Sequence, residues 1–196
     1  MKKIVFFFGF LLVTAFTKEA SMASTAKIVI MEDSKLLIAV RTNVNRFECH
    51  YNVENINNPV LVQFNKNEPK ISFDTATLEL YNDCFDCGNK GINRDFKKLL
   101  HSDEHPTIAL ELLQIIKRNA LEEVCEAQVQ IAMAGAKKTY WLPITLNEEG
   151  TMSICGSLDL KLSDFHLEAP KKALGMVVVK DGIVVKFDLK LKRLKS

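Results

Sequence analysis

The sequence has no excess of charge of either sign. It contains 26 Lys and Arg residues against 24 Asp and Glu residues, a formal net charge of +2. A nucleic-acid-binding domain would show a clear basic excess, so we expect no nucleic-acid partner. The sequence also has no internal repeat and no low-complexity segment, and its 47% of apolar residues is a normal globular share. With 196 residues, the chain supports one domain or at most two small ones.

Motifs of hydrolytic and phosphate chemistry are also missing. There is no G-x-S-x-G, no H-E-x-x-H and no glycine-rich loop placed after a strand. The four histidines, at positions 50, 101, 105 and 166, have no obvious nucleophile beside them in the sequence. The sequence therefore predicts no catalytic residue, and we expect a protein that is not an enzyme.

The sequence lacks an apolar run long enough to span a bilayer comfortably, although a shorter run lies at the N-terminus. Basic residues 2–3 precede this run, which covers residues 4–13, and small residues follow at 21–23. This order is typical of a secretory signal peptide. We therefore predict a signal peptide over residues 1–23 and export to the periplasm or out of the cell.

Cysteine is not abundant, and its count is odd. Export would place the five cysteines where disulfides are permitted, and at least one thiol stays unpaired within a monomer. Cys84 and Cys87, followed by His101 and His105, match the spacing of a zinc finger. However, the internal hydrophobic residues of a finger are misplaced, and Pro106 pulls His105 off the preceding helix. We therefore predict no metal site.

A redox site is another interpretation of Cys84 and Cys87. Thioredoxin-like pairs open a helix after a parallel strand, whereas this pair lies between an antiparallel strand and a polar turn. The neighbouring Asp83 and Asp86 would raise the pKa of the two thiols rather than lower it. A structural disulfide accompanied by buried thiols is the simpler interpretation.

The sequence does contain a sustained alternation of apolar and polar residues. It starts near residue 26 and is clearest after residue 126, where strand after strand has one apolar face. About eight or more such strands joined by short turns predict a mainly β fold, either an antiparallel sandwich or a closed barrel. We favour the barrel because closure removes unpaired edges. The pair Asp181-Gly182 predicts a hairpin between residues 176–179 and 183–191.

One stretch replaces this alternation with a helical pattern. Apolar residues spaced three to four apart predict a helix over about residues 90–100, which Asn89 or Asn93 can cap. Pro106 then disfavours helix at His105 and forces extended geometry. The chain passes directly from this helix into the next strand.

Three segments, taken in order, resemble the YceI-like family of exported lipid-binding barrels. They are a helix that runs into a strand, a stretch that starts at a glycine and ends in Asp-Phe, and a closing hairpin: Asn93-Arg94-Asp95 through His105-Pro106-Thr107-Ile108, Gly156 to Phe165, and Ala169 to Leu189. The likeness covers about residues 25–191 and is specific as an ordered set. One departure is Met133, which stands where the family frequently has a histidine.

The resemblance implies a fold and several structural residues. It implies one domain over residues 25–196, an elongated eight-stranded antiparallel β-barrel that is lipocalin-like, with the helix at about 90–100 across the barrel mouth. The residues that would fix the seat of this helix are Asn93, Arg94, Asp95 and Pro106. Cysteines at the positions of Cys49 and Cys87 resemble those of a subgroup, and we prefer this pair for a disulfide, while the residues alone leave the pairing open.

The resemblance also implies a function, that of an exported, non-enzymatic carrier of a lipophilic chain such as a polyisoprenoid, a quinone or a lipid. The alternation then predicts the residues that face the lumen: Leu80, Leu110, Leu112, Val129, Ile131, Leu142, Ile144, Leu158, Leu160, Phe187 and Leu189. We expect no cofactor beyond such a bound isoprenoid or lipid. A homodimer and a transient membrane contact stay open.

Two alternatives remain at this stage. The first is a structural or accessory module whose lumen is packed by side chains and which acts through its surface. The second is an enzyme or redox protein that uses Cys84, Cys87 and the histidines. A continuous apolar tunnel through the barrel would favour the carrier over both.

Overall fold

Antiparallel strands make up most of the chain in the computed structural model, which describes residues 23–117, 124–147, 151–172 and 177–194. The predicted signal peptide lies outside the described residues except for its last position. The strands are β1 (Ser24–Ile30), β2 (Lys35–Thr42), β3 (Arg46–Tyr51), β4 (Val60–Asn67), β5 (Lys70–Tyr81), β6 (Phe85–Asp86), β7 (Thr107–Lys117), β8 (Val124–Met133), β9 (Ala136–Asn147), β10 (Met152–Lys161), β11 (Lys171–Lys172) and β12 (Val177–Leu194). The helices are η1 (Val53–Asn55), η2 (Asn82–Cys84), α1 (Lys90–Leu99) and η3 (Leu162–Phe165).

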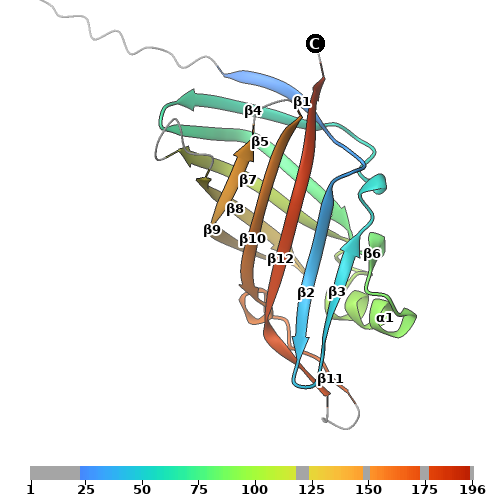
Figure 1. Ribbon diagram of the computed structural model, residues 1–196. Coiled ribbons are helices and arrows are strands. Elements are labelled where there is room, and N and C mark those ends of the chain that lie inside the picture. The colour runs from blue at the N-terminus through green and yellow to red at the C-terminus, as the bar shows by residue number, and fades with distance from the viewer. Residues whose placement is uncertain (1–22, 118–123, 148–150, 173–176, 195–196) are drawn as a thin grey trace, which may run out of the picture.

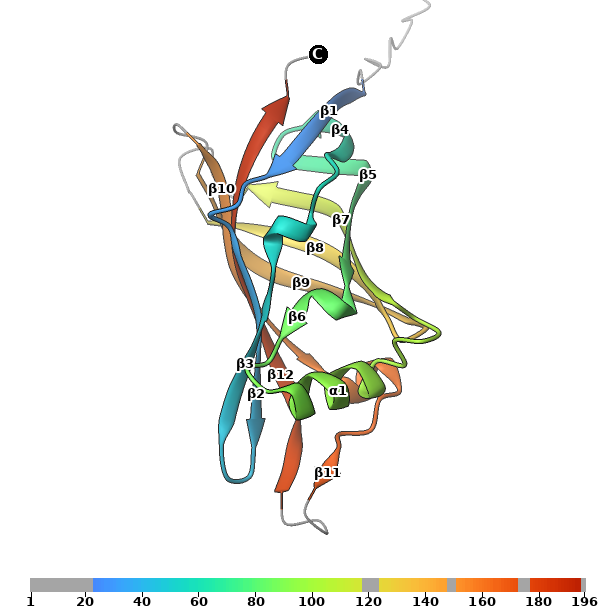
Figure 2. The ribbon, with the colours of Figure 1, turned by 90° about the vertical axis from the view of Figure 1, so that its right-hand side faces the viewer.

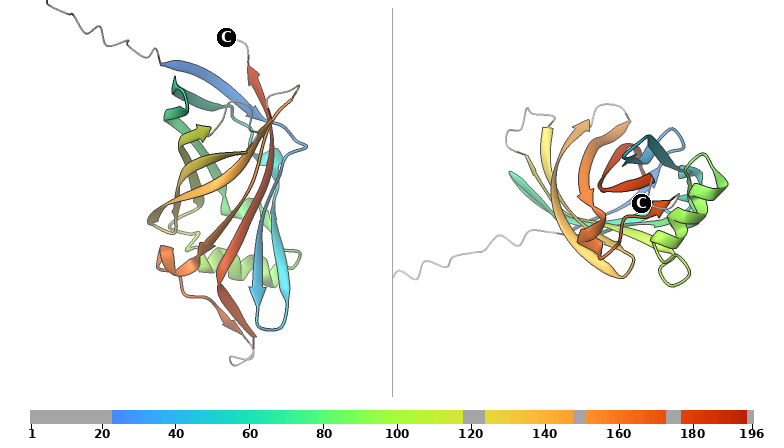
Figure 3. Two further views of the ribbon diagram at one scale, coloured as in Figure 1. Left: turned by 60° about the vertical axis from the view of Figure 1, so that its left-hand side comes forward. Right: turned by 90° about the horizontal axis from the view of Figure 1, so that it is seen from below.

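Eight of these strands form a closed ring. Their order around the ring is β1, β4, β5, β7, β8, β9, β10 and β12, and β12 pairs with β1 to complete it. Every pairing around the ring is antiparallel, and the strands wrap around a common axis (Figure 1 and Figure 3). The predicted eight-stranded antiparallel barrel is therefore confirmed.

Strand β12 is longer than the ring requires and carries a second group of strands. Its residues 191–194 pair with β1, whereas its residues 183–188 pair with β2. Strand β2 pairs in turn with β3, and β3 with the short β6. The consecutive strands β1 and β2 thus follow one another along the same edge of β12, and the molecule is elongated as a result (Figure 1).

The change from β1 to β2 along β12 takes place at Ser34. The buried Ser34 hydroxyl accepts a hydrogen bond from the Lys190 N–H (2.9 Å) and donates one to the Lys190 carbonyl (3.3 Å). The Met31 N–H also donates to the Lys190 carbonyl, at 2.8 Å. A side-chain hydroxyl therefore continues the hydrogen-bond ladder of β12 at the turn between the two strands.

The hairpin predicted at Asp181-Gly182 is wrong, because β12 runs through both residues without turning back. Its ladder with β2 shifts register between Val179 and Ile183, so the pair lies at an irregularity in a continuous strand. The Asp181 carboxylate accepts hydrogen bonds from the N–H and the hydroxyl of Ser163, at 2.8 and 2.7 Å. The polar side chain at this irregularity thus holds the neighbouring η3.

The helix predicted over about residues 90–100 is confirmed as α1. Asn89 caps it by accepting a hydrogen bond from the Gly91 N–H at 2.7 Å. The helix crosses one end of the barrel, beside β6 (Figure 2). No helix in the described ranges is both long enough and apolar enough to cross a membrane.

We expect Ser34→Ala to destabilise the fold by about 1–3 kcal/mol. The Lys190 N–H would lose its buried acceptor, and the Lys190 carbonyl would lose one of its two hydrogen-bond donors. Urea unfolding followed by far-ultraviolet circular dichroism measures this free energy. Ser157→Ala, at an exposed position of β10, is the matched control and should leave the unfolding midpoint unchanged. Equal midpoints for both variants would show that Ser34 does not hold the junction.

Candidate ligand-binding cavity

The barrel encloses an apolar cavity of about 420 Å³. All eight ring strands contribute to its wall, together with β2 and β6. Apart from Arg193, every described residue of the wall is apolar. The volume lies in the range of about 300–1,000 Å³ that is usual for small-molecule sites. It is also roughly three times the size of a ~150 Å³ cavity that holds benzene, which leaves room for an extended apolar group.

The residues predicted to face the lumen all lie on this wall. They are Leu80 of β5, Leu110 and Leu112 of β7, Val129 and Ile131 of β8, Leu142 and Ile144 of β9, Leu158 and Leu160 of β10, and Phe187 and Leu189 of β12. Sequence reasoning left out β4, whose Val60, Val62 and Phe64 also line the cavity. The same alternation of apolar residues was the signal that could have included them.

The two ends of the cavity differ in their exposure. Many wall residues are buried, among them Phe85, which packs against Phe96 of α1, and Leu80, Ile108, Ile131, Leu142, Leu158 and Leu160. Where β1 pairs with β4 and with the end of β12, several wall residues are partly exposed, namely Ile28, Val62, Phe64, Met152, Leu189 and Leu191, although Ala26 and Ile30 of β1 are buried there. The registers bring this second set together, because β1 pairs there with β4 and with the end of β12. The exposed Arg193 at the end of β12 also belongs to the wall, so the cavity reaches the surface at this end of the barrel.

The end of the barrel beside α1 is held by contacts between α1 and the loop before it. The Asn93 side chain accepts a hydrogen bond from the Cys87 N–H (2.7 Å) and donates one to the Asp86 carboxylate (3.0 Å). The hydrogen bond from Asn93 holds the pKa of Asp86 below its ordinary value, and the hydrogen bond from the Gly88 N–H contributes less to the same effect. Cys87 also forms a disulfide with Cys49 of β3. The helix is therefore tied to the barrel through this loop.

Three aromatic rings continue these contacts from the helix to the cavity wall. Phe85, which lines the cavity, lies 5.2 Å from Phe96 of α1 between ring centroids. The Tyr51 ring of β3 meets Phe85 edge-on at 4.9 Å. Burial raises the pKa of Tyr51 to about 12, so its phenol stays neutral in this apolar setting. The helix thus packs behind Phe85 at this end of the barrel, and none of its residues is itself part of the cavity wall.

The other residues predicted to seat the helix have unequal contacts. The Pro106 carbonyl accepts a hydrogen bond from the N–H of buried Asn82 (2.9 Å), and the Asn82 amide donates to the His105 carbonyl (2.8 Å). Asp95 is half-buried. Arg94 is exposed, and no hydrogen bond or ion pair joins its side chain to another residue of the described ranges. Asn93 and Pro106 therefore have visible anchoring contacts, which Arg94 lacks.

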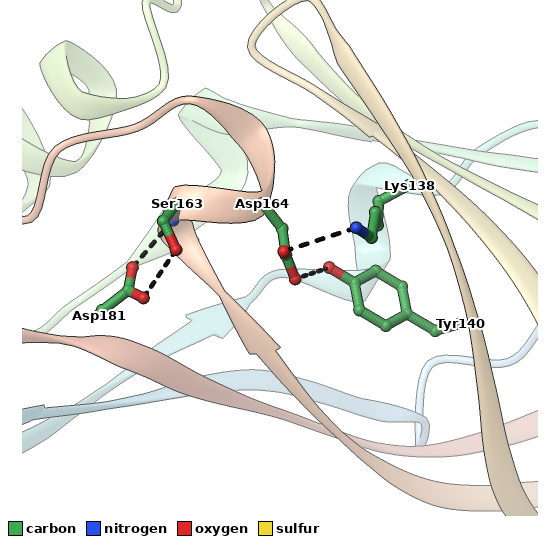
Figure 4. A network of polar contacts seen from close by, with 5 residues as sticks. All are labelled: Lys138, Tyr140, Ser163, Asp164 and Asp181. Carbon is green, nitrogen blue, oxygen red and sulfur yellow. Dashed lines mark hydrogen bonds and ion pairs between the residues drawn. The ribbon is translucent and has the colours of Figure 1, made fainter.

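A polar network fixes η3 at the same end of the barrel, and Figure 4 shows its members. The Tyr140 hydroxyl of β9 donates to the Asp164 carboxylate (2.9 Å), and Lys138 forms an ion pair with Asp164 (3.6 Å). Burial raises the pKa of Tyr140 above its ordinary value, and the hydrogen bond to Asp164 adds a smaller contribution in the same direction. Ser163 is held from the other side by Asp181 of β12. This end of the barrel is therefore linked to both β9 and β12.

A glycine interrupts the apolar row that β10 presents to the lumen. Gly156 lies between Ile154 and Leu158 in this row and pairs in register with Phe187 of β12. A Cβ atom at Gly156 would come within 2.5 Å of the Phe187 ring. The ring therefore lies over the glycine backbone, and this position leaves lumen volume free. Sequence reasoning missed the pair, although a missing side chain in an apolar row was an available signal.

The disulfide changes what the cysteine pair at 84 and 87 can do. Cys87 is bonded to Cys49, so Cys84 has no dithiol partner in this state. The Cys155 thiol donates to Asp188 at 3.1 Å, and this contact raises the pKa of the thiol, which lowers its reactivity. In the described parts of the chain, no group of three or more His, Cys, Asp and Glu side chains is arranged to hold a metal ion.

Comparison with known proteins finds likeness in structure rather than in sequence. No protein-family model matches the chain, and no curated protein is significantly similar to it. BcnA of Burkholderia cenocepacia superposes with a TM-score of 0.62 at 19% identity, over 81% of this chain and 96% of BcnA. A polyisoprenoid binding domain of Saccharophagus degradans superposes with a TM-score of 0.60 at 12% sequence identity, over 86% of this chain and 98% of that domain. The YceI protein of Campylobacter jejuni superposes with a TM-score of 0.52 at 10% sequence identity, over 100% of both chains.

The ring of eight strands around an apolar cavity defines the chain as a lipocalin-like β-barrel. Its particular fold is that of the YceI-like proteins, as the match to the Campylobacter jejuni protein over the whole of both chains shows. The fold implied by the sequence resemblance is confirmed. Because the identities are 10–19%, the likeness concerns the fold.

We expect Gly156→Ala to push the Phe187 ring into the cavity, because the new methyl group and the ring cannot occupy the same space. The variant should bind a fluorescent apolar probe such as N-phenyl-1-naphthylamine less well, at a stability cost of about 1–3 kcal/mol. The double variant Gly156→Ala/Phe187→Ala should recover probe binding. Gly182→Ala is the control, since a Cβ there meets no atom within 4 Å. Unchanged probe binding by Gly156→Ala would contradict this role.

The network around η3 predicts a loss of stability in acid. The hydrogen bond from the Ser163 hydroxyl holds the pKa of Asp181 below its ordinary value of 3.8, and the hydrogen bond from the Ser163 N–H adds a smaller contribution. A lowered folded-state pKa contributes stability above the unfolded pKa, and this contribution is lost as the pH falls through the folded value. The melting temperature should therefore fall more steeply below about pH 4 in the wild type than in Asp181→Asn. Asp159→Asn, an exposed control, should keep the wild-type slope, and equal slopes for all three would refute the assignment.

Proposed function

We propose that this protein is an exported, non-enzymatic carrier that holds a lipophilic chain in its barrel. The observation that carries this proposal is the apolar cavity of about 420 Å³, which reaches the surface at the exposed Arg193 near the end of β12. A carrier needs such an arrangement, since the ligand must leave water and must also be able to enter. The residues predicted from the alternation would supply the binding surface.

The affinity would come from removing apolar ligand surface from water. Each buried methylene group contributes roughly 0.8 kcal/mol before the costs of ordering the ligand are subtracted. A wall of this composition offers almost no hydrogen-bond partners, so a ligand with many polar groups would be penalised. Affinity should therefore rise with chain length, as expected for a polyisoprenoid, a quinone with an isoprenoid tail or another lipid.

The structural comparisons support this class of ligand. The Saccharophagus degradans neighbour is described as a polyisoprenoid binding domain, and it shares the barrel over 98% of its own length. The Cys49–Cys87 disulfide supports the export inferred from the predicted signal peptide, because disulfides persist in oxidising compartments such as the periplasm. A homodimer and a transient membrane contact are compatible with this role.

The two alternatives fit the structure less well. A module with a packed lumen would not leave a cavity of about 420 Å³ lined by the inward faces of its strands. A redox enzyme based on Cys84 and Cys87 would need a dithiol that the bond from Cys87 to Cys49 precludes in this state. The carrier therefore accounts for the most observations.

Filling the lumen should abolish binding without harming the barrel. In Val129→Trp the indole would occupy cavity space, and we expect the affinity for N-phenyl-1-naphthylamine or a medium-length polyprenol to fall about tenfold or more. Gln130→Trp, one position along β8 and on its outer face, is the matched control and should bind like the wild type. Native mass spectrometry of the purified wild-type protein should show a co-purified apolar molecule. A wild-type protein that is empty and binds neither probe would refute the carrier.

A further inference from the structure

The inward row of β12 ends in a charged residue. Alternate residues of this strand line the cavity, in the order Val185, Phe187, Leu189, Leu191 and Arg193. Lysines occupy the intervening positions 186, 190 and 192, which alternation directs to the outer face. Arg193 therefore stands where the alternation calls for another apolar residue. Among the described residues, it is the charged member of an otherwise apolar wall.

Arg193 is placed at the open end of the cavity. It lies opposite Ile28 in the ladder between β12 and β1, within the partly exposed part of the wall. Its own side chain is exposed, so its charge stays hydrated while no ligand is bound. No carboxylate in the described ranges forms an ion pair or a hydrogen bond with it. Within those ranges the guanidinium is therefore not engaged by an acidic group.

We propose that Arg193 binds the anionic head of an amphipathic ligand, a carboxylate or a phosphate monoester, whose chain lies in the lumen. This inference rests on the proposed carrier function and narrows its ligand class. A guanidinium presents a planar set of donors that matches both kinds of oxyanion in a bidentate manner. The same contact is not available to a ligand whose head is a neutral alcohol.

The distribution of polar groups also fixes the direction of the ligand. A charged head pushed deeper into the barrel would lie among buried apolar residues such as Leu80 and Ile131, without a partner and at a large desolvation cost. At the entrance, the head keeps contact with water and with Arg193. The chain therefore enters tail first and points towards the buried part of the wall that contains Leu80 and Phe85.

The test compares ligands that share one chain and differ in their heads. Oleate, oleyl phosphate and oleyl alcohol are titrated into the wild-type protein and into Arg193→Gln, with displacement of N-phenyl-1-naphthylamine as the readout. We expect Arg193→Gln to weaken the two acids about three- to tenfold, an effect that shrinks at high salt because the site is exposed. Binding of the alcohol should not change. The ratio of the affinities for oleate and oleyl phosphate identifies which oxyanion the site prefers.

Controls separate this inference from the carrier function. Lys192→Gln removes a neighbouring charge from the outer face and should bind all three ligands like the wild type. Inorganic phosphate and acetate at the same concentrations should not displace oleate, because they lack the chain. If the three ligands bind the wild type and Arg193→Gln alike, the headgroup site is refuted while the carrier stands. If none of the three binds the wild type, the headgroup site is refuted, and the carrier is refuted with it only when the protein is also empty and binds neither N-phenyl-1-naphthylamine nor a polyprenol.

Discussion

The fold depends on the closure of the barrel along β12. This strand of 18 residues pairs with β10 on one side and, on the other, first with β2 and then with β1. Each ring strand pairs with two neighbours, although β9 and β10 pair only over residues 144–147 and 153–156, and these pairings fix the register of each strand. Because side chains alternate along a strand, a fixed register decides which residues face the lumen. The apolar cavity is therefore a direct consequence of this closure.

The length of β12 also explains why the two ends of the barrel differ. Where β12 pairs with β1, the strands form the complete ring, and the cavity opens there. Where it pairs with β2, the additional strands β3 and β6 extend the wall, and α1 with its disulfide-linked loop covers the end (Figure 2). Ser34 joins the two regions by bonding to both backbone groups of Lys190. The ring and the additional strands are therefore joined along one strand.

Much of this arrangement was predictable from local pattern, because alternation and helical spacing are local properties. They identified the barrel, the helix and eleven wall residues. They failed where a distant partner decides the outcome. Asp181-Gly182 has the composition of a turn, but the partner Ser163 and the ladder with β2 hold it in a strand. Gly156 acquires its role only through Phe187, which lies 31 positions away (187 − 156) and is adjacent only after β10 and β12 pair.

The helix and the rim at the end of β12 have separate roles. The helix crosses one end of the barrel, as the sequence predicted, and packs there on Phe85 (Figure 2). In the carrier that we propose, Asn93 and Phe96 contribute to stability, whereas entry and the choice of head group depend on β1, β4 and the end of β12. Arg193, the charged residue of the described wall, would there select which lipophilic molecules the barrel admits and the direction in which they lie.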